Sequence, residues 1–412
     1  MDILRGYRVE VNYDLYVSPG GNDNNTGLSP SQAMKTITKA VHRIAADSLN
    51  IKTVHLLPGT YIEGENEQIL PIPVKSNTNI IGAGSDQVTI YSDVLCAFGQ
   101  PKFIGVRKCK NTIIRGFSIA EGVASNRIAI LNTNTHTNLQ LTDIVIQNMS
   151  VCKLGAIFFY QLFNGVIDSV VMRNINTPES AMQIVQIYDG TIRNSTFEYI
   201  HSTYTSPDTP GDDSWSMAVM NFWVWGSFKV ENCTFRNISV QNNQFTFHIS
   251  SGSNPETVVD VSVNNNLFDN IRSNSARAIG FAKNVAGNYR VSNNTFYNNF
   301  GAVSAVNVIG NIQMRNNIFV NSNCPYEINM SPVWFQGPLT VLDFDYNNIR
   351  GGFSAIYNPD HRNTLIYGSN NTSADPMFAG TTAGEPDYLR LAQGSPCIDS
   401  GTPDTTGLEL LP

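Results

Sequence analysis

Charged residues are scarce in this sequence, and this scarcity limits the partners it can have. Asp, Glu, Lys and Arg together make up 14% of the 412 residues, whereas a typical soluble domain has about 25%. The formal net charge is −7, and Lys and Arg form no run that could neutralise a phosphate backbone. We therefore expect no nucleic-acid partner. Hydrophobic residues still reach 42%, which excludes a disordered chain, because such a chain lacks apolar surface to bury.

Long apolar runs and paired cysteines are also missing. The sequence has no stretch of about eighteen apolar residues, so we expect no membrane span. Residues 1–5 lack the apolar core of a secretory signal. The six cysteines form no CxxC pair and have no His at zinc-ligand spacing, which argues against a zinc site and against a disulfide framework. Their redox state stays open.

A short motif recurs over most of the chain. In the copy Val263-Asn265-Phe268-Asn270 an apolar residue is followed by Asn, by a large apolar residue and by Asn again. Stacked coils of a parallel β-helix produce such a period, because each coil consists of about three short strands and their turns. We therefore predict an all-β fold, a single-stranded right-handed parallel β-helix of about nine to eleven coils. The large apolar residues of successive copies lie 23 to 38 residues apart, at Ile119, Ile146, Met172, Phe197, Phe235, Phe268, Phe296, Phe319 and Ile349.

Two residue types repeat at fixed positions of this motif. The large apolar residues, many of them Phe, should stack inside the coils. Asn two residues after the first apolar position should form an amide ladder at a turn, in which each side chain bonds backbone groups or the next amide. An Asn-rich β-sandwich would not explain one residue type at one position in successive copies. The predicted ladder consists of Asn194, Asn232, Asn265, Asn293 and Asn316.

The chain is predicted to form one domain, residues 1–412, with three parts. Residues 31–46 have the apolar spacing of an amphipathic helix, and such a helix could cap the open end of the coils. The amino-terminal part with this cap comprises residues 13–62, the coils comprise residues 63–373, and a turn-rich closing part comprises residues 374–412.

Both ends of the chain resemble those of bacterial pectate-lyase-like β-helix proteins. LYVSPGGND at residues 15–23, KTI at 35–37 and PGTY at 58–61 are similar to the amino-terminal signature of that family, and GSPCIDSG at 394–401 resembles its closing segment. The resemblance implies the β-helix fold and a secreted or cell-surface location, with the signal peptide outside this sequence. The family includes polysaccharide lyases, glycoside hydrolases and proteins of unknown role, so the resemblance implies no single reaction.

Two adjacent coils are longer than the others, and they are where we expect a ligand groove. The marks Phe197, Phe235 and Phe268 enclose the intervals of 38 and 33 residues, and insertions of this kind widen a coil beyond its short turns. The candidate catalytic residues of this region are Asp212, Asp213, His248, Arg277 and Lys283. The candidate substrate-binding residues are Tyr204, Trp215, Trp223 and Trp225.

These residue types suit three kinds of site. A glycoside hydrolase needs two carboxyl groups with different pKa values, a role open to Asp212 and Asp213. Clustered carboxylates such as Asp208 and Asp212 could instead bind Ca²⁺, the one cofactor we consider. A lyase acting on a uronate needs a cation beside the carboxylate and a base, which Arg277 and Lys283 could provide. A solvated turn at the aspartates and a solvated histidine are the alternatives.

Strand alternation places the two central tryptophans together. Between Met220 and Trp225 one face of a strand would carry Phe222, and the other would carry Trp223 and Trp225. Two outward tryptophans form a flat apolar strip on which sugar rings stack, unless they pack beneath a loop. We therefore predict a carbohydrate-active enzyme, either a polysaccharide lyase or a glycoside hydrolase. A noncatalytic glycan-binding or adhesive protein and a structural spacer are the alternatives.

Overall fold

The structure is a computed structural model. The chain divides into two compact units, and each unit is described by itself. Unit 1 comprises residues 10–203 and unit 2 comprises residues 218–403. The described ranges are 10–45, 47–64, 66–92, 101–106, 108–121, 128–132, 135–151, 155–178, 180–203, 218–240, 245–251, 258–272, 278–282, 286–301, 303–306, 309–321, 325–330, 340–358 and 363–403.

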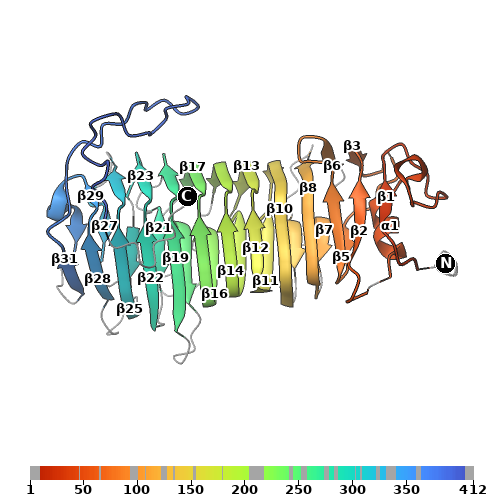
Figure 1. The fold of residues 1–412 in the computed structure, drawn as a ribbon, viewed down its shortest axis with the longest axis horizontal. Coiled ribbons are helices and arrows are strands. Elements are labelled where there is room, and N and C mark those ends of the chain that lie inside the picture. Colours follow the sequence, from red (N-terminus) through yellow and green to blue (C-terminus); the bar gives the residue numbers. More distant parts are fainter. Residues whose placement is uncertain are drawn as a thin grey trace. The chain divides into compact units, whose positions relative to one another are not determined.

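Unit 1 consists of three parallel sheets, whose strands follow one another around each coil (Figure 1). The first sheet pairs β1 (Leu15–Val17), β2 (Lys52–Leu56), β5 (Thr78–Gly82), β8 (Lys110–Glu121), β10 (Thr135–Ser150), β12 (Gly165–Asp168) and β14 (Met182–Arg193). The second sheet pairs β3 (Gly59–Ile62), β6 (Val88–Ser92), β8, β10, β13 (Val171–Thr177) and β15 (Thr196–Ser202). The third sheet pairs β4 (Ile72–Val74), β7 (Pro101–Val106), β9 (Ile128–Asn132), β11 (Ile157–Phe163) and β14.

Unit 2 also consists of three parallel sheets. Its first sheet pairs β16 (Ala218–Glu231), β19 (Val259–Asn264), β22 (Ala286–Ser292), β25 (Ile309–Arg315), β28 (Thr340–Asp345) and β31 (Thr364–Tyr367). Its second sheet pairs β17 (Thr234–Val240), β20 (Leu267–Asp269), β23 (Thr295–Tyr297), β26 (Ile318–Val320) and β29 (Asn348–Ile349). Its third sheet pairs β16, β18 (Phe245–Ser251), β21 (Ile279–Ala282), β24 (Val303–Val306), β27 (Ile328–Asn329) and β30 (Ile356–Tyr357), with the 3-10 helix η2 (Gly352–Ala355) before β30.

This arrangement confirms the predicted parallel β-helix. Among the described residues, the second sheet has six strands in unit 1 and five in unit 2, which matches the upper limit of the predicted number of coils. The repeat also begins earlier than the sequence motif suggested, because Tyr61 and Ile90 precede Ile119 in the same register. These three residues are buried, so they extend the inner apolar row of unit 1 towards its amino-terminal end.

The predicted aromatic stack is confirmed in unit 2. The rings of Phe235, Phe268, Phe296 and Phe319 are fully buried, and neighbouring rings stack with centroids 4.8 to 4.9 Å apart. The spacing equals the distance between paired strands, because each ring comes from the same position of the next coil. The rings therefore follow the register of the second sheet, in which these residues are paired from strand to strand.

The predicted row of Asn residues lies at the turns of unit 2, and a second, buried row of amides lies one residue later. Asn265, Asn293 and Asn316 have a left-handed backbone, with φ of 53°, 57° and 58°, a conformation that Asn tolerates better than most residues. Their side chains lie on the outer side of the turn; Asn265 Nδ2, for example, donates to Asn232 Oδ1. The buried ladder is formed by the residues that follow each turn residue, namely Asn266, Asn294, Asn317 and Asn347, and the half-buried Asn371 extends it.

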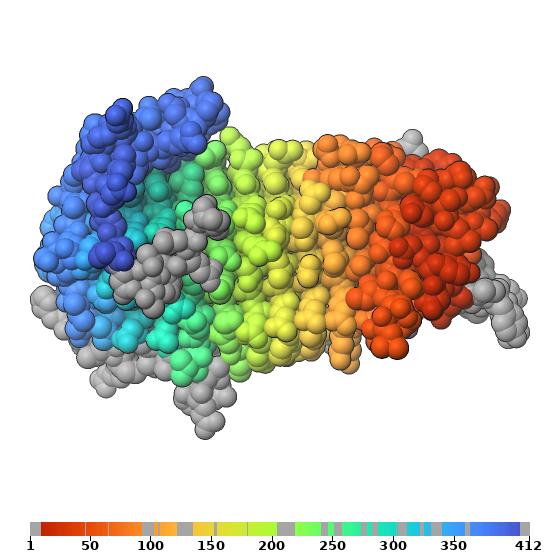
Figure 2. All heavy atoms as spheres, in the orientation of Figure 1, coloured from red at the N-terminus to blue at the C-terminus, as the bar shows by residue number. Residues whose placement is uncertain are grey.

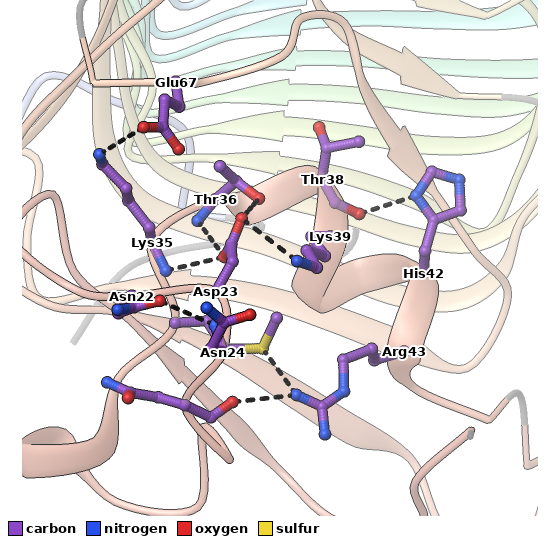
Figure 3. A network of polar contacts seen from close by, with 12 residues as sticks. Asn22, Asp23, Asn24, Lys35, Thr36, Thr38, Lys39, His42, Arg43 and Glu67 are labelled. Carbon is purple, nitrogen blue, oxygen red and sulfur yellow. Dashed lines mark hydrogen bonds and ion pairs between the residues drawn. The ribbon is translucent and has the colours of Figure 1, made fainter. Parts of the chain in front are cut away.

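The amino-terminal helix is shorter than predicted. Residues 31–46 were expected to be helical, but the structure has a 3-10 turn, η1 (Pro30–Gln32), and one helix, α1 (Ile37–Arg43). Between them Met34 bridges Val17 in an extended conformation. Ahead of α1, Oδ1 of Asp23 accepts the backbone N–H groups of residues 35 and 36 at 2.9 Å each (Figure 3). The first N–H group of the helix, that of Ile37, donates to Oε1 of Gln68 at 3.2 Å, so a side chain satisfies this free helix-end group.

Gly59 and Tyr61, from the PGTY segment, contact the preceding residues of the first coil of unit 1. The buried hydroxyl of Tyr61 contacts the carbonyl oxygens of Val17 and Leu57 at 2.8 and 2.9 Å. Gly59 has a φ of 138°, and a Cβ there would lie 2.9 Å from the ring of Pro19. The similar sequence segments therefore contact one another at the start of the coils.

Residues 374–403, which we call the closing segment, fold back along the side of unit 2 (Figures 1 and 2). The hydroxyl of Tyr388 donates to Oδ2 of Asp269 in β20 at 2.6 Å, and the guanidinium of Arg236 lies over the Tyr388 ring. The chain then returns towards the last coils, where Asn348 Nδ2 donates to the thiol of Cys397 at 3.1 Å. The predicted closing segment thus covers the side of the second sheet.

Candidate functional site

The outer face of the third sheet in unit 2 carries an unusual group of polar residues. In the parallel register Asn221 of β16 lies beside His248 of β18, and Trp223 lies beside Ser250. Alternation sends Phe222 of β16 and Phe247 and Ile249 of β18 into the core. Thr246, His248 and Ser250 therefore lie on the outer face of β18, next to Asn221 and Trp223 on the outer face of β16.

Most of these outer residues are buried, although outer positions of a coil usually face water. The exposed fractions are 1% for Asn221, 0% for Thr246, 5% for His248 and 4% for Ser250. Polar groups are costly to bury unless they are hydrogen-bonded. A group of four on one outer face is therefore a candidate functional site.

One hydrogen bond fixes the state of the imidazole. His248 Nδ1 lies 2.9 Å from Asn221 Oδ1. An amide oxygen only accepts hydrogen bonds, so Nδ1 carries a proton and donates it. In the neutral ring the lone pair is then on Nε2, which makes this atom the basic position of the side chain. Asn221 thus orients His248 for work as a base or as a hydrogen-bond acceptor.

Two hydroxyl groups on the outer face of β18 are buried without a hydrogen-bond partner among the described residues. Within the described part of the chain, Thr246 Oγ1 and Ser250 Oγ are buried and have no hydrogen-bond partner. Each buried polar atom without a partner costs about 1 to 3 kcal/mol. Such a cost is expected at sites where a ligand provides the missing partner.

Two tryptophans and a glycine lie next to these polar residues. Trp223 and Trp225 are half-buried, so part of each indole is accessible. On the other side of His248, the residue in register on β21 is Gly280, which has no side chain to cover the imidazole. The site therefore combines apolar ring surface, two hydroxyls and an oriented imidazole.

The structure describes only some of the predicted site residues. Trp223 lies on the outer face of β16, as the strand alternation predicted, and His248 lies on the outer face of the neighbouring strand β18, where it is buried. Their roles in a site remain predictions. Seven other predicted residues lie outside the described residues, so their roles remain predictions: Tyr204, Asp208, Asp212, Asp213, Trp215, Arg277 and Lys283.

Two members of the site were missed by sequence reasoning. Thr246 and Ser250 both belong to β18, and neither was singled out from the sequence. The signal that could have found both is the alternation of Thr246, His248 and Ser250 with Phe247 and apolar neighbours.

The described residues contain no candidate for a metal centre. No group of three or more His, Cys, Asp or Glu residues that could hold an ion occurs among the described residues. The predicted Ca²⁺ ligands, Asp208 and Asp212, lie outside these ranges. In the described helices, none is long and apolar enough to cross a membrane.

One family model and several solved structures match this chain. Residues 19–202 match the profile of a family described as "Protein of unknown function (DUF1565)". The comparison of the sequence with curated proteins found no match.

Similar solved structures include two lyases and an adhesin. A pectate lyase, Pel9A, is 12% identical, with 96% of this chain and 93% of that chain covered and a TM-score of 0.42. A rhamnogalacturonan lyase is also 12% identical, with coverage of 93% and 97% and a TM-score of 0.43. The Streptococcus pneumoniae surface protein and adhesin PfbA is 15% identical, with coverage of 84% and 97% and a TM-score of 0.40. The fold assignment rests on the strand pairing described above.

Proposed function

We propose that this protein binds a polysaccharide along the outer face of β16 and β18 and cleaves it. The observation that carries the proposal is the group of Thr246, His248 and Ser250 beside Trp223, with the imidazole held by Asn221. Indole rings stack on the apolar faces of sugars, while hydroxyl groups pair with sugar hydroxyls. Such a role suits a secreted or cell-surface protein.

The described residues favour β-elimination over hydrolysis. In β-elimination a base removes the proton from C5 of a uronate, the C4–O bond breaks, and its electrons leave with the oxygen, which takes a proton from solvent. His248 Nε2 has the lone pair needed for the first step, because Nδ1 donates to Asn221. Arg277 and Lys283 would neutralise the uronate carboxylate. Hydrolysis would instead use Asp212 and Asp213.

A second candidate function is glycan binding without cleavage. The burial of His248, with 5% of its surface exposed, favours it, because a base must reach the proton that it removes. Trp223 and Trp225 would then provide the binding surface, and His248 and Asn221 would support the strand beneath them. An adhesive surface protein would fit this description.

A polysaccharide panel distinguishes the two functions. The protein is incubated with acidic and neutral polymers, and unsaturated uronate absorbance and reducing ends are measured together with binding. His248→Asn retains an amide that can donate to Asn221 but lacks Nε2, so turnover should fall by about 100-fold while binding stays unchanged. Trp223→Ala should weaken binding by about 10-fold.

The matched control is Tyr160→Ala, an exposed aromatic residue on β11 in the third sheet of unit 1. Binding without products in the wild-type protein would support the noncatalytic function. If no polymer binds, or if Trp223→Ala and Tyr160→Ala have equal effects, the proposed site is wrong.

A further inference from the structure

A second concave site lies in unit 2 between the turns and the closing segment. It is a cavity of about 270 Å³. On one side it is lined by Asn293, Asn316, Tyr346 and Asn348, and on the other by Leu391 and Cys397. None of these residues belongs to the outer face of β18, so the cavity is independent of the function proposed above.

The turn residues point their side chains out of the coils at this place. Asn293, Asn316 and Tyr346 all have a left-handed backbone, with φ between 56° and 58°. Earlier coils of unit 2 use Asn at this position, as at Asn232 and Asn265. A bulky residue is unfavourable in this conformation, so Tyr346 replaces a better-suited residue where its ring lines the cavity.

The closing segment forms a fixed wall. The backbone N–H of Thr402 donates to Asn316 Oδ1 at 2.8 Å, and Asn348 Nδ2 donates to Cys397 Sγ. Farther along, Tyr388 donates to Asp269, whose carboxylate is buried. Because the segment is anchored at Tyr388, Cys397 and Thr402, the cavity is formed before a ligand binds, which lowers the cost of binding.

The chemistry of the lining is neutral. Among the described residues that line the cavity, none carries a formal charge at neutral pH. Burial raises the pKa of the Cys397 thiol, which keeps it protonated there. Asn293 Nδ2 already donates to Asn264 Oδ1 and Asn316 Oδ1 accepts from Thr402, so the other polar atom of each amide is the one that can bond a ligand, whereas Tyr346 and Leu391 offer apolar surface. This combination matches the two faces of a sugar ring, hydroxyl edges and an apolar C–H face.

We infer that this cavity binds a single neutral sugar unit, such as the end or a branch of a glycan. Its volume lies just below the range of about 300 to 1,000 Å³ that drug-sized ligands occupy, which suits one ring rather than an oligosaccharide. The absence of charge among the described lining residues disfavours uronates and phosphates, whose buried charge would have no partner.

The test measures binding of single sugars to the full chain. Ligand-detected NMR is run with glucose, galactose, xylose and rhamnose, and with galacturonate and glycerol for comparison. At least one neutral sugar should bind with a Kd of about 1 mM. Tyr346→Asn should weaken that binding by about 10-fold without lowering Tm, because Asn is the residue that other coils have at this position. Tyr199→Asn, at an exposed left-handed Tyr of unit 1, should change nothing.

Cys397 provides a second measurement in the wild-type protein. Alkylation of this residue, followed by mass spectrometry of its peptide, should slow when the bound sugar is present. The inference is overturned if no neutral sugar binds or protects Cys397 at about 10 mM. It is also overturned if galacturonate or glycerol binds as well as the best sugar, or if Tyr346→Asn and Tyr199→Asn bind like the wild type.

Discussion

In unit 1, the residue that enters the core after the turn from the first to the second sheet is apolar or small. Phe117, Ile144 and Val170 occupy this position and are fully or almost fully buried. In unit 2 the first coil has Cys233 at this position, and the next coils have the buried residues Asn266, Asn294, Asn317 and Asn347. The same turn is thus stabilised by apolar packing in one unit and by amide hydrogen bonds in the other.

The two solutions differ in what each coil requires of its neighbour. Asn294 Oδ1 accepts the backbone N–H and the Nδ2 group of Asn266, while its own Nδ2 donates to Val263 O and to Asn317 Oδ1. Every polar atom is satisfied only if the next coil also has an amide there. Apolar side chains need no hydrogen-bond partner in the next coil. The position in unit 1 can therefore be occupied by residues of different shape, such as Phe117 and Val170. The ladder of unit 2 therefore fixes both residue type and register.

The largest expected effect concerns the core beside this ladder. Phe268→Ala removes the second ring of a stack of four and should lower the free energy of unfolding by about 3 to 5 kcal/mol, because neighbouring rings cannot collapse into the cavity. Met172→Ala, the change at the same position in unit 1, should cost less, because flexible side chains repack more easily. Urea denaturation measures both. A loss below about 1 kcal/mol for Phe268→Ala would contradict the close packing of the stack.

The next effect concerns the ladder itself. Asn294→Leu keeps four side-chain heavy atoms but removes the acceptor of the Asn266 backbone N–H and the bonds to Val263 O and Asn317 Oδ1, so unfolding should become easier by about 2 to 4 kcal/mol. The change is measured by urea denaturation.

The reverse change in unit 1 sharpens this comparison. Val170→Asn introduces a single buried amide with no second Asn beside it, so it should destabilise rather than extend a ladder. If Asn294→Leu melts like the wild type, or if Val170→Asn is stabilising, the ladder does not act as described.

The inner row and the strand alternation could be predicted from the sequence, because one residue type recurs at one position. The ladder could not be placed to the residue, because Asn-Asn pairs at residues 265–266, 293–294 and 316–317 fit both positions of the turn. The pair Tyr346-Asn347 contains the missing signal. A tyrosine suits the outer position better than the inner one, so the second residue of each pair is the buried one.

The candidate site was only partly predictable for a different reason. Alternation places Trp223 and His248 on an outer face, but burial of His248 depends on what lies over that face. No local pattern in β16 or β18 reveals this. The hydrogen bond from His248 to Asn221 likewise depends on a register between strands 27 residues apart.

Two buried histidines extend the comparison of the units. In unit 2, His248 Nδ1 donates to Asn221, whereas in unit 1 His136 Nδ1 accepts the backbone N–H of Cys109 at 3.0 Å. His136 therefore carries its proton on Nε2 when neutral, the opposite tautomer. The tautomer follows from the partner in each case.

The burial of His136 predicts a pH dependence of stability. Burial lowers the pKa of His136 to about 4, whereas an unfolded His has a pKa of about 6.5. Below pH 6.5 the unfolded chain therefore binds a proton that the folded chain does not bind, so stability falls as the pH drops towards 4, by up to about 3 kcal/mol. His136→Asn retains an acceptor for Cys109 without a titrating group. The difference between the two proteins in urea denaturation from pH 7 to pH 4 should follow this curve, and a constant difference would contradict it.

The smallest expected effect tests the outer row of turn residues in unit 2. Asn265 has a φ of 53°, and its Nδ2 donates to Asn232 Oδ1 at 2.8 Å in an exposed position. Asn265→Ala should cost about 1 kcal/mol, because alanine is strained in the left-handed conformation and the exposed hydrogen bond contributes little. Asn265→Gly separates the two causes, since glycine adopts this conformation freely and loses only the hydrogen bond. Glycine should therefore be nearly neutral in urea denaturation. If glycine costs as much as alanine, the hydrogen bond outweighs the strain, and the outer row would be a second ladder as important as the buried one.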